Sequence, residues 1–524
     1  MEKRGCGMLL PVASLPSKYG IGAFSKEAYE FVDKLAKAGQ QYWQILPLGP
    51  TGYGDSPYQA FSAFAGNPYF IDLEQLTKEG LLTQEECQMA DFGSDDRDID
   101  YGKIYENRFP LLKKAFLRWE EQQKKSGMDE KEIRKYLKKQ LRAETRDYCF
   151  YMALKNQFGG KSFSEWDKDI RTREEDVLKH YKKELREEIA FYEFQQVMFE
   201  RQWKALKAYA NEHGIRIIGD IPIYVAADSA DSWAHPELFQ FDEDCRPTAV
   251  AGCPPDAFSA TGQLWGNPLY RWDYHKKTGY SWWMDRMEYS FELYDVVRVD
   301  HFRGFDAYYS IPAGSKTAEF GHWEDGPGYD LFKKMNDRFG KLDIIAEDLG
   351  FLTPSVFKLV EKTGFPGMKV LEFAFDGGPG NQYLPHHYGK NCVVYTGTHD
   401  NMTLQGWYHD LSPETKKFAV EYLGNEQTPQ GEIHWDYIRL ALSSTARLAV
   451  IPVQDYLGLG NRARINEPST LGKNWRWRMK SEDLTEEILE RCRQMAERYS
   501  RVPEKKPESE RVEEESAGAD QSAQ

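Results

Sequence analysis

Eight short apolar runs recur along this chain, and turn or polar residues follow each of them. Apolar residues at nearly every position of such short runs are typical of strands buried on both faces. Helical spacing marks segments between the runs, for example 25–38, which Gly39 follows, and 354–363, between Thr353 and Gly364. The runs are 8–10, 42–46, 215–220, 296–300, 344–347, 368–373, 392–400 and 448–453.

Strands that alternate with helices predict an α/β protein, and eight such units in series predict a closed (β/α)8 TIM barrel of about 250 residues. An open doubly wound sheet is the alternative, but no G-x-G-x-x-G motif follows the first run. The chain has 524 residues, so a barrel leaves room for long insertions.

Two segments between the expected strands are too long for ordinary loops. The first, at about 101–211, is dense in Lys, Glu, Leu and aromatic residues at helical spacing, which predicts a large inserted helical subdomain. A single long coiled coil is excluded because no heptad is sustained. The second, at about 221–295, is rich in Trp, Pro, Gly and Asp, which predicts long structured loops over the active-site mouth.

Composition and charge indicate the remaining organisation and the setting. A catalytic barrel is expected over 1–500, and 503–524, with seven acids and three bases, is expected to be a disordered acidic tail. The net charge of −15 argues against nucleic acid or a membrane surface as a partner. No run of about 20 apolar residues and no signal peptide is found, and the seven cysteines are scattered, so a cytoplasmic protein with reduced thiols is expected.

Acidic residues stand at the ends of four of the eight runs. They are Asp220, Asp300, Glu347 with Asp348, and Asp400. The carboxyl ends of barrel strands form the active site, so these side chains are expected to meet, and like charges there raise one another's pKa. Glycosidic-bond chemistry requires one carboxyl group kept as an acid and another kept as an anion. Asp348 and Asp400 could each be a helix N-cap instead, an alternative that weakens when four acids occur together.

Arg298 precedes Asp300 by two residues, and the period of a strand places both side chains on one face, toward the barrel interior. An arginine beside an inward aspartate would keep that aspartate ionised and oriented, as a nucleophile requires. A purely structural buried salt bridge is the competing interpretation.

Aromatic and amide side chains cluster after the same strand ends, and a sugar ring needs both flat apolar faces and hydrogen-bonding groups. The segments in question contain Tyr53, Ser56 and Tyr58 after the second run, Trp265 and Asn267 in the long loop, and 474–478 after the eighth run. Ordinary core packing is the alternative, and it is the one expected for Trp282 and Trp283.

Other kinds of chemistry lack a motif in this sequence. His301, His399 and nearby acids could ligate a divalent ion, but the patterns H-x-H, H-E-x-x-H and D-x-D-x-D-G are absent, so no metal is expected. No Walker A loop and no G-x-S-x-G motif occurs, which argues against phosphate chemistry and a serine hydrolase.

A series of stretches between Arg4 and Arg478 matches a known pattern in order. They include Gln44-Ile-Leu-Pro-Leu-Gly-Pro-Thr through Ser56-Pro-Tyr, Gly219-Asp-Ile-Pro-Ile-Tyr-Val, Gly262-Gln-Leu-Trp-Gly-Asn-Pro, Arg298-Val-Asp-His-Phe-Arg-Gly-Phe, Ala346-Glu-Asp-Leu-Gly, Thr398-His-Asp-Asn and Gly472-Lys-Asn-Trp-Arg-Trp-Arg. On these stretches the chain resembles glycoside hydrolase family 77, the 4-α-glucanotransferases or amylomaltases. The helical segment resembles the family in character only.

The resemblance implies catalytic roles. Asp300 would be the nucleophile, Glu347 the general acid/base, and Asp400 the carboxylate that stabilises the transition state through sugar hydroxyls. Arg298 would orient Asp300. The reaction would be a retaining double displacement, for which the Asp300 and Glu347 carboxyl groups should lie about 5–5.5 Å apart.

The resemblance also implies how substrate is held. His399, Asp220 and Tyr58 would bind the donor sugar, and Trp265 would lie in the acceptor region. Asn267, Tyr53 and Ser56 belong to the same segments and are expected to contact sugar. The family uses no cofactor and acts on maltooligosaccharides and other α-1,4-glucans, with a glucan or glucose as acceptor.

Three places depart from the family pattern. They are Ala23-Phe24 after Gly20-Ile-Gly, then Cys253, and Ala257. The last two belong to a loop that shapes the acceptor side, so chain-length and cyclisation preference are affected but the chemistry is not. Two other functions are compatible with the same barrel. A retaining α-glucan hydrolase needs the same three carboxylates. A non-catalytic glycan-binding protein needs neither Asp300 nor Glu347.

Overall fold

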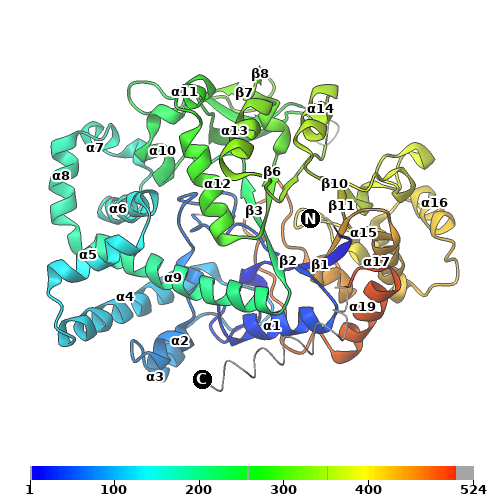
Figure 1. Ribbon diagram of the computed structural model, residues 1–524, viewed down its shortest axis with the longest axis horizontal. Coiled ribbons are helices and arrows are strands. Elements are labelled where there is room, and N and C mark those ends of the chain that lie inside the picture. The colour runs from blue at the N-terminus through cyan, green and yellow to red at the C-terminus, as the bar shows by residue number, and fades with distance from the viewer. Residues whose placement is uncertain (1–2, 53, 256–258, 351, 503–524) are drawn as a thin grey trace, which may run out of the picture.

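The structure is a computed structural model that describes residues 3–52, 54–255, 259–350 and 352–502, so the expected acidic tail lies outside the described residues (Figure 1). Eight strands form one parallel sheet in the order β10-β11-β12-β1-β2-β3-β6-β9. The N–H of Ala346 in β9 donates to the carbonyl of Pro366, just before β10, at 2.9 Å, and this contact closes the barrel. The strands are β1 (Gly5–Leu9), β2 (Tyr42–Gln44), β3 (Arg216–Pro222), β6 (Val296–Asp300), β9 (Ile344–Ala346), β10 (Gly367–Val370), β11 (Cys392–Tyr395) and β12 (Leu448–Pro452). Each predicted run overlaps one of these strands, and the predicted (β/α)8 barrel is confirmed.

Side chains alternate along the strands between the barrel interior and the surrounding helices, because the period of a strand is two. Ile218 and Val296 belong to a cluster inside the barrel, while Ile217 and Val297 join the larger core between strands and helices. The same alternation places Arg298 inside the barrel, two residues beyond Val296. Strand geometry therefore delivers a charged side chain to the interior.

Both helices predicted from apolar spacing are present. Helix α1 (Lys26–Lys37) buries Ala28, Phe31, Val32 and Leu35 against the barrel core. Helix α14 (Pro354–Thr363) begins after the N-cap Thr353 and ends at Gly364, whose φ of 71° is the left-handed value that glycine adopts at little cost.

Helices fill the chain between β2 and β3 and lie on one side of the barrel, at the left in Figure 1. They are α2 (Leu73–Lys78), α3 (Gln84–Met89), α4 (Tyr101–Lys125), α5 (Glu130–Gln140), α6 (Ala143–Gln157), α7 (Lys168–Arg171), α8 (Glu175–Glu184) and α9 (Arg186–Glu212). The buried amide of Gln196 in α9 pairs with both backbone groups of Gly66, at 2.7 and 2.9 Å. The helical region thus holds the segment that follows β2. Although α9 has 27 residues, no helix in the described part of the chain is long and apolar enough to cross a membrane.

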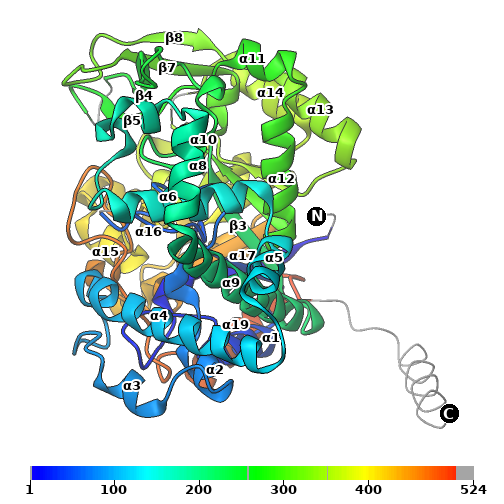
Figure 2. The ribbon, with the colours of Figure 1, turned by 90° about the vertical axis from the view of Figure 1, so that its left-hand side faces the viewer.

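Segment 221–295 contains more regular structure than the predicted loops. It forms α10 (Ala230–Ala234), β4 (Ala249–Cys253), β5 (Gln263–Pro268), α11 (Trp272–Lys277) and α12 (Ser281–Leu293). Strands β4 and β5 form a second, antiparallel sheet with β7 (Ala307–Pro312) and β8 (His322–Asp325), in the order β5-β4-β7-β8, seen at the top of Figure 2. The sequence pattern missed it because β4 and β5 are short, glycine-containing and not alternating, and the second partner of β4, which is β7, lies beyond β6. Trp282 and Trp283 are core residues of α12, as predicted.

The segment after α19 (Glu486–Arg498) seals the amino-terminal end of the barrel. Arg501 is fully buried, and its guanidinium donates to the carbonyl groups of five residues at 2.6 to 3.3 Å. These residues are Leu442, Gly5, Arg447, Ser444 and Ala446. One side chain therefore ties β1 to the loop that leads into β12.

Replacing Arg501 with alanine is expected to lower the free energy of unfolding by about 3 kcal/mol or more, because buried carbonyl groups lose their donors. Thermal and denaturant unfolding measure the change. Arg498→Ala is the matched control, since Arg498 is exposed on the preceding helix. Equal stability of the two variants would contradict the sealing role.

Candidate active site

The acidic residues at four strand ends meet at one end of the barrel. Asp220 lies in β3, and Asp300 is the last residue of β6. These two strands are parallel neighbours, and Asp220 is paired with Arg298 in their register. Glu347 follows β9 directly, and Asp400 lies in the turn after β11. The charges of Asp220 and Asp400 act on Asp300, and the charge of Asp300 acts on Glu347. The four groups thus form one electrostatic unit, as their positions at the strand ends predict.

Arg298 lies at the centre of this unit with its side chain 3% exposed. Its Nη1 lies 2.8 and 2.7 Å from the two oxygens of Asp220 and 3.1 Å from Oδ1 of Asp300. The hydroxyl of Tyr58 donates to Oδ2 of Asp220 at 2.9 Å. Asp220 is fully buried in these contacts, whereas the side chain of Asp300 remains 31% exposed. Arg298 therefore makes a buried salt bridge with one aspartate and orients the other toward the mouth.

Two backbone N–H groups hold the carboxyl group of Glu347. His301 donates to Oε2 and Leu349 donates to Oε1, both at 2.8 Å. His301 has a φ of 53°, uncommon for a residue with a side chain, and this conformation turns its N–H toward Glu347. Glu347 therefore lies at a place fixed by backbone on both sides.

The surroundings of Asp300 and Glu347 act differently on their two protons. Burial raises the pKa of Glu347, and the charge of Asp300 raises it further. Burial also raises the pKa of Asp300, and the guanidinium of Arg298 acts against the rise in both groups, as the two N–H groups do at Glu347. Arg298 contacts Asp300 directly, as it does Asp220, and this favours ionisation of Asp300 before Glu347.

Asp400 is held as an anion. Its Oδ1 accepts from Nδ2 of Asn466 at 2.6 Å and lies 3.3 Å from Nε2 of His399. Burial alone would raise the pKa of Asp400, but His399 and Asn466 hold it at about 2. Asp400 in turn raises the pKa of His399 against the effect of burial. The side chain of Asp400 is 43% exposed, so an oxygen remains available to a ligand.

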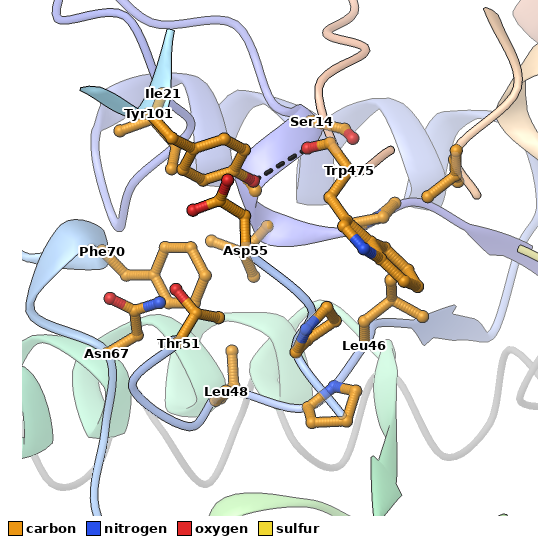
Figure 3. Close-up of a pocket in the computed structure, with 16 residues that line it drawn as sticks. Ser14, Ile21, Leu46, Leu48, Thr51, Asp55, Asn67, Phe70, Tyr101 and Trp475 are labelled. Carbon is orange, nitrogen blue, oxygen red and sulfur yellow. Dashed lines mark hydrogen bonds between the residues drawn. The ribbon is translucent and has the colours of Figure 1, made fainter. Parts of the chain in front are cut away.

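Aromatic rings form a wall beside these groups. Tyr58 stacks on His399, with ring centroids 5.1 Å apart and planes 17° apart, and Trp475 lies 6.0 Å from Tyr58. Figure 3 shows Trp475 at one side of a pocket that Thr51, Asn67 and Phe70 line at the other. The hydroxyl of Tyr101, the first residue of α4, donates to the carbonyl of Trp475 at 2.8 Å. The helical region thus also supports the aromatic wall.

The remaining predicted site residues differ in their surroundings. The rings of Trp265 in β5 and His301 meet edge to face, with centroids 4.8 Å apart. Trp265 therefore adjoins the active-site cup, by which we mean the strand ends that carry Asp220, Arg298, Asp300, Glu347 and Asp400. Asn267 is buried, and its amide donates to the carbonyl of Val225 and accepts from Gln59, so both ends already have protein partners. Ser56 accepts from the N–H of Tyr58 and fixes that turn. Tyr53 lies outside the described residues.

Neither acid suggested as a helix N-cap has that position. The N-cap of α14 is Thr353, and the N-cap of α15 (Leu404–Asp410) is Thr403. Asp348 instead accepts from the N–H of Met368 in β10, at 2.6 Å. Asp400 is therefore free for the role that its contacts indicate, and Asp348 joins β9 to β10.

Two polar residues of the site were not predicted from the sequence. Asn466 binds the Asp400 carboxylate, and Arg464 donates to the Asp400 carbonyl at 2.6 Å and to that of Asn466 at 2.7 Å. In the sequence, only their position after the eighth strand indicated a place near the site, because the loop that contains them has no motif. Within the described ranges, no three His, Cys, Asp or Glu side chains are grouped to hold a metal ion.

A barrel with paired carboxyl groups at its strand ends is typical of enzymes that cleave or transfer glycosyl groups. The family model described as 4-alpha-glucanotransferase, glycoside hydrolase family 77, matches residues 10–485. The chain belongs to this family.

Related proteins and a solved structure match this chain over nearly its whole length. A 4-alpha-glucanotransferase of Clostridium butyricum is 48% identical over 94% of this chain and 99% of that protein. One from Thermus thermophilus is 49% identical over 95% and 99%. The structure of an amylomaltase from Streptococcus agalactiae in complex with acarbose superposes with a TM-score of 0.90, at 42% identity, over 96% of this chain and 100% of that one.

Proposed function

We propose that the protein is a 4-α-glucanotransferase that moves a segment of an α-1,4-glucan from a donor to the 4-hydroxyl of another glucan or of glucose. Family membership supports the reaction class. One observation supports the chemistry above all others: Arg298 contacts Asp300, while burial and the Asp300 charge raise the pKa of Glu347. This arrangement favours a carboxylate at Asp300 and a carboxylic acid at Glu347.

In the first step Asp300 attacks the anomeric carbon of the donor, and Glu347 gives its proton to the departing glycosidic oxygen. The bond to the leaving glucan breaks as the bond to Asp300 forms, with inversion. Arg298 keeps the attacking carboxylate ionised and aimed. Positioned acid catalysis of this kind contributes about 10²–10⁴-fold.

In the second step the 4-hydroxyl of an acceptor enters, and Glu347, now a base, takes its proton. The acceptor oxygen replaces Asp300 at the anomeric carbon, and the second inversion restores the α-linkage. Retention requires the two carboxyl groups to lie about 5–5.5 Å apart. Asp400, held as an anion by His399 and Asn466, binds sugar hydroxyls more strongly as positive charge develops on the ring.

Substrates and setting follow from the same features. The wall of Tyr58, His399 and Trp475 offers flat faces to pyranose rings, which suits maltooligosaccharides. Trp265, beside His301, marks the acceptor side. Neither nucleic acid nor a membrane is proposed as a partner, since the net charge is −15. The cysteines lie in the described part of the chain as thiols, which suits a reducing compartment, and we propose the cytoplasm.

Transfer to an acceptor sugar is faster than hydrolysis only if water is excluded from the covalent glycosyl-enzyme. We propose that the strand bearing Trp265 and the loop before Tyr58 cover the site for this purpose. A retaining α-glucan hydrolase would use the same three carboxylates and differ only in this cover. A non-catalytic glycan-binding protein would have no need for the proton held on Glu347.

Incubation with maltotriose alone tests the proposal. We expect free glucose together with a ladder of longer maltooligosaccharides, at a constant total of reducing ends, when products are separated by chromatography. Shorter sugars only, with reducing ends that rise steadily, would identify a hydrolase. Unchanged maltotriose would favour the binding protein.

A further inference from the structure

Two buried acids outside the cup contact the turn that carries Asp400. The turn runs from Thr396, after β11, to Leu404, the first residue of α15. The acids are Glu372, in the short helix η6 (Leu371–Phe373), and Asp455, in α18 (Val453–Tyr456). Their exposed fractions are 9% and 1%. Carboxyl groups this deeply buried are rare unless they bind specific partners.

Asp455 joins the two ends of the turn. Its Oδ1 accepts from the N–H of Leu404 at 2.8 Å, and its Oδ2 accepts from the hydroxyl of Thr396 at 2.5 Å. Eight positions separate these two donors along the chain, yet one carboxyl group binds both. The turn is therefore closed at its base by a side chain from another element.

Glu372 supports the middle of the turn. Its N–H donates to the carbonyl of Thr396 at 3.1 Å. Polar groups of Asn401 and Met402 act on its carboxyl group and lower its pKa. Gly397 leaves the space for it, because a Cβ there would lie 2.7 Å from Oε1 of Glu372. A larger residue at that position would therefore displace the Glu372 carboxyl group.

A short chain of hydrogen bonds within the turn leads from Asn401 to Asp400. The amide of Asn401, whose Cβ borders Gly397 as the Glu372 carboxyl group does, accepts from the N–H and the hydroxyl of Thr398 at 2.9 and 2.8 Å. The Thr398 hydroxyl accepts in turn from the N–H of Asp400 at 3.2 Å. Displacing the Glu372 carboxyl group would thus shift the backbone on which the Asp400 side chain stands.

We propose that Glu372 and Asp455 are positioning residues that fix the 396–404 turn and thereby set the place of the Asp400 carboxylate. The inference rests on the proposed function, in which Asp400 stabilises the transition state. A displacement of about 1 Å at a group of this kind costs on the order of 10²-fold in rate. The two residues would act through Asp400 without touching substrate.

The surroundings of Glu372 favour its neutral form. Burial raises its pKa well above the ordinary value, the charge of Asp455 raises it further, and Arg464 acts against both. Its Oε1 is buried with no hydrogen-bond partner in the described part of the molecule. A neutral glutamine has the same shape and keeps the backbone hydrogen bond to Thr396, so it should replace Glu372.

The test compares kcat and KM for maltotriose disproportionation with the Tm of each variant. For Glu372→Ala and Asp455→Ala we expect kcat to fall about 10- to 100-fold with KM within about threefold. For Glu372→Gln we expect kcat within about threefold of the parent protein. Loss of activity in Glu372→Gln as large as in Glu372→Ala would overturn the positioning role of the neutral group.

Glu193→Ala is the matched control for lost stability. Glu193 is a buried glutamate of α9 with an oxygen that has no hydrogen-bond partner among the described residues. The charged groups that act on it, Arg134, Lys138 and Arg146, belong to α5 and α6 of the helical region. We expect its Tm to fall while kcat stays within about twofold. An equal fall in kcat for Glu193→Ala and Glu372→Ala would show that the lower activity of Glu372→Ala comes from lost stability, and would contradict the positioning role.

Asp400→Asn, measured beside these variants, separates the two levels of the argument. A large fall in kcat for Asp400→Asn with none for Glu372→Ala and Asp455→Ala would refute the positioning role and leave the proposed function intact. Full activity of Asp400→Asn would refute the catalytic role of Asp400, and with it the positioning role.

Discussion

Asp300→Asn is expected to lower kcat/KM for maltotriose disproportionation by at least about 10⁴-fold, because an amide cannot form the glycosyl ester through which the reaction passes. The amide has nearly the shape of the carboxylate and can accept from Arg298, so the cup should keep its form. Calorimetric binding of maltooligosaccharides should therefore persist. Chromatography of the products over long incubations measures the residual rate.

Asp306→Asn provides the control for Asp300→Asn. Asp306 lies six residues beyond Asp300 and binds the hydroxyl of Ser355 at 2.7 Å, outside the cup. The same chemical change there should leave activity within about twofold, as for surface substitutions in general. Turnover by Asp300→Asn equal to that of Asp306→Asn would remove Asp300 from the mechanism.

The barrel could be predicted from the sequence because its strands are buried on both faces. Burial of that kind requires apolar residues at nearly every position, and this leaves a continuous signal even in β2 and β9, which have only three residues each. Strands β4 and β5 lack that signal because they are half exposed and contain glycine. The pairing of β4 with β7 joins residues 57 to 63 positions apart, which no local pattern contains.

The predicted site depended on a rule about strand ends, and it succeeded where a strand fixes the side chain. Arg298 and Asp300 share a face because they are two residues apart in β6. The groups that were missed are backbone N–H groups and loop residues. The N–H of His301 reaches Glu347 only through a left-handed backbone, and Asn466 reaches Asp400 only through the course of a loop.

One departure from the family pattern has a structural explanation. Phe24 is 3% exposed and packs against Phe70, Phe199 and Trp203, so the position has become part of the core between α1 and α9. Cys253 ends β4 and pairs with Gln263 of β5, on the strand that bears Trp265. Ala257 lies outside the described residues. The effect of these two on chain length or cyclisation stays a prediction.

Glu347→Gln is expected to separate the two steps of the reaction. With maltotriose, kcat should fall about 10²–10⁴-fold, because the glutamine cannot protonate the leaving oxygen. With α-maltosyl fluoride as donor, formation of the glycosyl-enzyme should remain fast, since fluoride leaves without a proton. The second step then lacks its base, and the intermediate should accumulate. Mass spectrometry of the quenched protein should find one maltosyl group, attached to Asp300 after proteolysis.

Azide and pH complete this experiment, because each reports on the missing proton transfer. Azide needs no base, so it should release the trapped group from Glu347→Gln as α-maltosyl azide and restore turnover. In the parent protein the alkaline limb of activity reports loss of the Glu347 proton. Since burial and Asp300 raise this pKa, the limb should lie well above the ordinary range of glutamate. For Glu347→Gln with fluoride and azide it should vanish, and a limb that persists would assign the proton to another group.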